Sequence, residues 1–138
     1  MRREIANEYK RSIEQANAAE QRSDLDSAFA ALERAHILAQ RYLFAHIYTH
    51  WRMLKVGIKR QDVREMFGQV VRMLATVPAY LVGWVPMGNT GGSNVSALRP
   101  MSLPADIAPL LEDFSVWRDV LKRVVLLLLL LLSGLAAL

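Results

Sequence analysis

The sequence has no cysteine among its 138 residues. Disulfide bonds, thiolate metal ligands and cysteine nucleophiles are therefore excluded. Three motifs of catalysis and nucleotide binding are also missing: Gly-x-Ser-x-Gly, His-Glu-x-x-His and the P-loop pattern that ends in Gly-Lys-Ser/Thr. The sequence thus gives no indication of an α/β-hydrolase, a zincin protease or a P-loop nucleotide-binding protein.

The chain also has only a small excess of positive charge. The 17 Lys and Arg residues against 13 Asp and Glu residues give a net charge of +4, and the two signs are interleaved along the chain. Nucleic-acid binding generally needs a basic patch or stripe, so we expect no nucleic-acid partner. The first residues, Met1-Arg2-Arg3-Glu4, run directly into a polar helical pattern, and no secretory signal is visible.

Helical periodicity dominates the first 80 residues. Apolar residues recur at spacings of three and four over 3–21, 25–40, 43–56 and 62–77. Gly57 is placed to cap the third segment, and Pro78 to end the fourth. The second and fourth segments begin about 35 residues apart, which is the period of tetratricopeptide-type repeats of two helices. We therefore predict an all-α fold of tetratricopeptide-like antiparallel helical hairpins.

Residues 79–104 differ in composition from the helical segments. They are rich in Gly, Pro, Asn and Ser, which predicts a long irregular loop. The polar tip over 88–94 suits a nest of backbone N–H groups that binds an anion. Turn formation alone also explains these residues, and it is the favoured interpretation.

The C-terminal part predicts a further amphipathic helix that starts near residue 105 and runs into 124–138. This last stretch has no charge and contains seven consecutive leucines. At about 1.5 Å per residue it spans about 22 Å, which is short against the hydrocarbon core of about 30 Å. A uniformly apolar helix needs cover on all sides, so we expect it to attach to a membrane, with Trp117, Lys122 and Arg123 at the interface.

The expected organisation is a helical domain over 1–112, which includes the loop, and an amphipathic segment with a hydrophobic tail over 113–138. If the tail spans the inner membrane, Lys122 and Arg123 place the N-terminal domain in the cytoplasm. The alternative is a core or interfacial helix, and the protein is then cytoplasmic if the tail does not insert.

The three histidines lie within fifteen consecutive residues. His46 and His50 share one helix face, and His36 and His46 flank the turn near Arg41, so a tight hairpin brings all three together. The next hairpin lets a carboxylate, Glu65, approach His50. Imidazole and carboxylate ligands suit a divalent transition metal such as zinc, iron or copper, so we predict a metal site made of His36, His46, His50 and Glu65.

Other interpretations of the same residues stay open. The histidines form a hydrogen-bonded structural network in one, and bind an organic ligand or transfer a proton in another. Further ligand-binding candidates are Gln69, Asn89, Thr90 and Asn94. An enzyme with a histidine base has the least support, because no second catalytic group is fixed by spacing. The main alternative function is a tetratricopeptide-like module that binds a protein partner and has structural histidines.

Four segments, LERAHILAQR, AHIYTHWRML, DVREMFGQVVRML and PMGNTGGSNVSALRPMSLPADIAPLL, together resemble a bacterial family, domain of unknown function 3703. The resemblance covers 24–112 and leaves out the polyleucine tail. It implies a bacterial protein, and, because similar proteins are sometimes encoded near heavy-metal resistance and transport genes, a role in metal handling or resistance. The matching residues are His36, Gln40, His46, His50, Asp62, Glu65, Gln69, Asn89, Thr90, Gly91, Gly92 and Asn94.

Overall fold

The computed structural model describes residues 1–136, and within them it has helices and no strand. The prediction of an all-α fold is confirmed. The helices are α1 (Arg3–Gln21), α2 (Leu25–Ala39), α3 (Leu43–Arg60), α4 (Val63–Val82), α5 (Ala108–Leu111) and α6 (Val116–Ala136).

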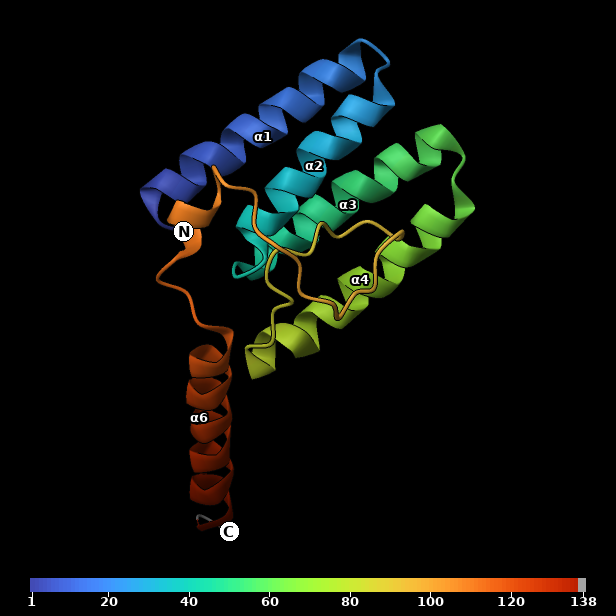
Figure 1. Cartoon of the computed structure of the whole chain (residues 1–138). Coiled ribbons are helices and arrows are strands. Elements are labelled where there is room, and N and C mark those ends of the chain that lie inside the picture. The colour runs from blue at the N-terminus through green and yellow to red at the C-terminus, as the bar shows by residue number, and fades with distance from the viewer. Residues whose placement is uncertain (137–138) are drawn as a thin grey trace.

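The first four helices lie in a row, each packed against the next (Figure 1). Residues 83–107 form a long connection that runs back across this row toward α1, and α6 projects away from it (Figure 1). The loop predicted over 79–104 overlaps this connection, and α4 occupies its first residues up to Val82. The four-helix row and the connection together enclose the histidines.

Small residues let the first helices approach closely. Ala16, Ala19 and Ala28 are buried between α1 and α2, where they pack with Leu32 of α2 and Met53 of α3. Alanine permits this because its short side chain keeps the helix axes near to each other. A second apolar cluster joins α1 and α2 to the returning chain; its buried members are Ile5, Ile37, Leu38, Ile107 and Leu111.

The end of α3 differs from the prediction. Gly57 lies inside the helix, and Gln61 ends it with a left-handed backbone at φ 56°. Gly57 serves a different purpose, since a Cβ there would lie 3.3 Å from Cγ of Glu65. The glycine therefore allows α3 and α4 to approach, and the C-cap moves four residues on.

Pro78 does not end α4, which continues to Val82 and stops at Gly83 with φ 77°. A proline inside a helix loses one backbone hydrogen bond to the carbonyl four residues before it. That carbonyl belongs to Leu74, and both Leu74 and Pro78 lie on the exposed side of α4, where water can bind the free oxygen. The helix tolerates the proline for this reason.

The helix expected from residue 105 is divided into the short α5 and the separate α6. The break follows from burial, because Leu111 and Phe114 turn inward toward the helical row. The guanidinium carbon of Arg41 lies 3.9 Å from the centre of the Phe114 ring, which fixes the chain at this point.

Within residues 1–136, no helix is long and apolar enough to cross a membrane. This corrects the expectation of a membrane-spanning tail. The described part of the apolar run ends at 136, and the preceding turns of α6 carry Asp119, Lys122 and Arg123. The charged turns leave too few apolar residues for the hydrocarbon thickness.

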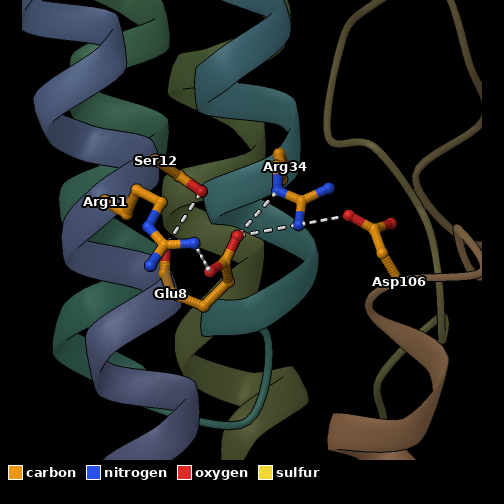
Figure 2. Close-up of polar contacts among 5 residues, drawn as sticks. All are labelled: Glu8, Arg11, Ser12, Arg34 and Asp106. Carbon is orange, nitrogen blue, oxygen red and sulfur yellow. Dashed lines mark hydrogen bonds and ion pairs between the residues drawn. The ribbon is translucent and has the colours of Figure 1, made fainter.

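An ion-pair cluster ties the returning chain to the helices (Figure 2). Nη2 of Arg34 on α2 lies 2.8 Å from a carboxylate oxygen of Glu8 on α1 and 2.6 Å from one of Asp106. Arg11 adds a second cation to Glu8 at 3.2 Å. We call Glu8, Arg11, Arg34 and Asp106 the arginine cluster. It brings together α1, α2 and the chain just before α5, and the long connection is thereby held across the row.

Candidate metal centre

The three histidines meet at one point between α2, α3 and the long connection. His36 stands in the last turn of α2, and His46 and His50 lie one turn apart on α3 after the short turn at 40–42. Nε2 of His36 lies 2.8 Å from that of His46 and 3.2 Å from that of His50, and the third pair is 3.1 Å apart. The spacing of the histidines along the sequence does not predict which of their ring nitrogens converge.

The protonation of His36 follows from its partner. Its Nδ1 lies 2.9 Å from the backbone carbonyl oxygen of Asn89. A carbonyl oxygen only accepts hydrogen bonds, so Nδ1 carries the proton and donates it. In a neutral ring the other nitrogen is then unprotonated, and Nε2 of His36 presents a lone pair to the cluster.

The same argument applies to His50 through the side chain of Gln69. Nδ1 of His50 lies 2.6 Å from Oε1 of Gln69. The amide cannot be turned round, because its Nε2 donates to Glu65 Oε1 at 2.5 Å and to the carbonyl oxygen of Gly91 at 2.9 Å. Gln69 therefore accepts the Nδ1 proton of His50, and Nε2 of His50 is also unprotonated.

Two unprotonated nitrogens thus face each other at 3.2 Å, on His36 and His50. A proton on Nε2 of His46 can satisfy one of them well, but no hydrogen atom lies between the other two. Both residues are 2% exposed, and two buried lone pairs that face each other without a protein donor between them are unfavourable. A cation at the centre of the three nitrogens removes this conflict.

Burial also keeps the three imidazoles neutral. It lowers the pKa of His36 well below its usual value, an effect that the neighbouring histidines strengthen. Burial, with His50 close by, lowers the pKa of His46 to about 3, and burial lowers the pKa of His50 to about 4 although its bond to Gln69 acts in the opposite direction. Near neutral pH the rings are therefore in the form that binds metals.

The distances suit a transition-metal ion. Three nitrogens about 3 Å apart share a point about 2 Å from each, the Zn–N distance for histidine, roughly 1 Å out of their plane. Among residues 1–136, the converging group of metal-ligating side chains consists of these three histidines. Imidazole ligands of this number are found with zinc, copper and iron.

The long connection supplies one wall of the site. Gly91 has φ 84°, and a Cβ there would lie 2.7 Å from the ring of His36. Asn89 orients this wall: its Oδ1 accepts from the N–H of Gly91, and its Nδ2 donates to the carbonyl oxygens of Ser96 and Arg99. The glycine and the asparagine thus fix the carbonyl group that orients His36.

Glu65, predicted as a ligand, lies beyond Gln69. Both carboxylate oxygens are engaged, one by Gln69 and the other by the N–H and hydroxyl of Ser93. Glu65 therefore supports His50 through Gln69. Glu65 also binds Ser93 and so holds the long connection against α4.

The remaining candidates differ in position. Gln69 and Asn89 contact the histidines directly. Thr90 is half-buried, and Asn94 is exposed. The N–H groups of Gly91 and Ser93 already bind side-chain oxygens of Asn89 and Glu65, which agrees with turn formation rather than an anion nest.

Sequence reasoning missed Arg72, which holds the loop from α4. Its Nη2 donates to the carbonyl oxygens of Gly92 at 2.8 Å and Val95 at 2.6 Å. A signal was present, because Glu65, Gln69 and Arg72 follow at helical spacing and must share one face of α4. That face is the one turned toward the loop.

Comparison with known proteins adds a family and no activity. No curated protein matches the chain, and no solved structure matches it. The profile of one family, described as protein of unknown function (DUF3703), matches residues 3–111, which include all the helices of the row and the complete histidine site. The chain therefore belongs to the DUF3703 family.

Proposed function

We propose that the protein binds one divalent transition-metal ion through Nε2 of His36, His46 and His50, and that it acts in metal handling. The observation that carries the proposal is the pair of unprotonated nitrogens on His36 and His50, which face each other in a buried site. A metal ion converts this repulsion into two bonds. Zinc, iron and copper are the candidate metals, and copper(II) is expected to bind most tightly among them.

The hydrogen bonds made by the other ring nitrogens of His36 and His50 support the same function. Metal-ligating histidines usually donate their other ring N–H to a carbonyl or carboxylate group, which fixes the ring orientation. His36 donates to the Asn89 carbonyl and His50 to the Gln69 amide. Glu65 acts here through Gln69 and not as a direct ligand.

The test is elemental analysis of tag-free protein, followed by titration with zinc and copper. We expect one metal ion per chain in the wild type. The double variant His46→Ala/His50→Ala is expected to lose it while its helical circular dichroism is kept. Trp51→Ala/Lys55→Ala is the matched control, because it has the same spacing on the same helix and both residues are exposed. A well-folded wild type that takes up neither metal would overturn the proposal.

The second candidate function is a tetratricopeptide-like interaction module with structural histidines. It is favoured by the exposed apolar side of α4, where Val63, Phe67 and Leu74 are 74%, 72% and 73% exposed. The partner that fits is α6 of a second copy, since α6 has 21 residues against 20 in α4 and exposes its leucines.

Sedimentation of the full chain tests this candidate. We expect a dimer in the wild type and a monomer in Phe67→Glu/Leu74→Glu, because two charges then face the leucines of the partner helix. Gln15→Glu, an exposed change on α1, is the control and should leave the dimer intact. A wild-type monomer at micromolar concentrations would contradict it.

A further inference from the structure

A cavity of about 80 Å³ adjoins the three histidines. Its wall is mainly apolar and includes Ala75, Ala79, Trp84, Pro86 and Leu98. Leu98 is 69% exposed, so this side of the cavity reaches the protein surface. The histidine cluster and the exposed Leu98 therefore border the same, mainly apolar cavity.

The residues that line the cavity offer no further ligand to a metal. None of them is a carboxylate. Thr76 donates its hydroxyl to the carbonyl of Arg72, and Asn89 uses both ends of its amide within the loop. Zinc sites with three protein ligands keep a fourth position for water or substrate, whereas structural sites have four protein ligands. The three histidines correspond to a site with three protein ligands and one free coordination position.

The size of the cavity limits what can enter. By volume it has room for a few water molecules or for a ligand of a few heavy atoms. The small side chains of Ala75 and Ala79 leave this space, since they lie one helical turn apart on α4 and both border the cavity. Larger residues at these two positions would fill it.

The charge of the site selects among small ligands. A divalent ion held by three neutral imidazoles keeps its full charge of two. Arg72 also lines the cavity, and its side chain adds a further positive charge nearby. The nearest carboxylate along the ligand chain, that of Glu65, is separated from His50 by Gln69. A small anion is therefore favoured over a neutral molecule or a cation.

We propose that the metal centre keeps one exchangeable coordination position that opens onto this cavity and binds a small anion. The proposal rests on the proposed function, because it needs the metal. It assigns the cavity between α4 and the long connection as the ligand site, with Ala75 and Ala79 as the residues that determine ligand size. The bound anion replaces a water molecule on the metal, and no bond within the anion is broken.

The experiment uses azide and the full chain loaded with copper(II). Azide on copper(II) gives a charge-transfer absorption band, so a titration measures its affinity and stoichiometry. We expect one azide per copper in the wild type. In Ala75→Leu and in Ala79→Leu we expect at least tenfold weaker azide binding with unchanged copper content. Val70→Leu is the matched control, because it enlarges an exposed residue of the same helix away from the cavity.

The outcomes separate this proposal from the one before it. Protein without bound copper would overturn the metal function itself. Protein with one copper and no azide band would leave the metal function standing and overturn the open position. Equal azide affinity in the wild type, Ala75→Leu and Ala79→Leu would show that azide does not bind in this cavity. If a leucine variant fails to fold, Ala79→Val is used instead, because valine fills less of the same cavity.

Discussion

Two polar clusters hold the long connection against the helical row, and they are built in opposite ways. In the arginine cluster each cation meets a carboxylate, with distances of 2.6 to 3.2 Å (Figure 2). In the histidine cluster three groups of one kind converge, and two of them present lone pairs to each other. In the first cluster every charge has a partner of opposite sign, whereas the second leaves two lone pairs without a donor between them.

The two clusters also differ in how deeply they are buried. Side chains in the arginine cluster reach the surface, with Arg34 27% and Asp106 62% exposed, so water screens their attraction. His36 and His50 are 2% exposed, and the low polarity around them increases both the cost of an unpaired group and the gain from filling the site. A polar cluster therefore points to a ligand when it is buried and its protons cannot be distributed without conflict.

The largest expected effect is the stabilisation of the wild type by metal. A ligand that binds only the native state at 100 times its dissociation constant raises the free energy of unfolding by about 2.7 kcal/mol. We expect zinc to produce an increase of this order, measured by denaturant unfolding with and without the ion. We expect no such response from the arginine cluster, so an equal stabilisation of His46→Ala/His50→Ala by zinc would remove the contrast.

His46→Gln tests whether the histidine cluster can be made complete without a metal. The amide group supplies two N–H donors for the unprotonated nitrogens of His36 and His50. We expect the response to zinc to disappear and the metal-free variant to be more stable than the metal-free wild type by about 1 kcal/mol. A variant that is still stabilised by zinc to the full extent would show that His46 is not a ligand.

Gly91→Ala tests how closely the loop must approach His36. The new Cβ would lie 2.7 Å from the ring, on a backbone with φ 84°. We expect a loss of about 1–3 kcal/mol in the free energy of unfolding. Gly134→Ala on α6 is the control, since a Cβ there has nothing within 4 Å, and it should not destabilise the protein. Equal free energies of unfolding for the two variants would mean that the loop can move away from His36 without destabilising the protein.

Gln69→Leu removes the acceptor that orients His50. Loss of such an outer partner typically lowers metal affinity about 10–100-fold. We expect a weakening in this range, measured by competition with a chelator of known affinity, and a retained stoichiometry of one ion. The same affinity in Gln69→Leu and the wild type would exclude the orienting role.

The smallest effect is expected in the arginine cluster, from Asp106→Asn. The hydrogen bond from Arg34 lowers the pKa of the Asp106 carboxyl. Because the folded pKa is the lower one, its contribution to stability is present above the unfolded value, near 4, and is lost as the pH falls through the folded pKa. The difference between wild type and variant should shrink below pH 4 and in high salt. A difference that persists at pH 2 would refute this account.

Much of the framework could be predicted from residue patterns. Apolar spacing located the four helices of the row, and the i, i+4 pair His46 and His50 with His36 across a short turn predicted their proximity. The errors have local causes in the tertiary structure. Gly57 is needed for contact with α4, Pro78 lies where water can reach the freed carbonyl, and Leu111 and Phe114 are drawn into the core, which divides the last helix.

By itself the sequence determined that the chain forms helices and that three imidazoles gather at the base of one hairpin, because both follow from spacings of a few residues. Only the tertiary structure decided which ring nitrogens face inward and why two of them carry no proton. Those properties depend on Asn89, which is 53 positions from His36, and on Gln69, which is 19 from His50. Contacts across such separations are set by how helices and loop pack together, and a pattern along the chain does not contain them.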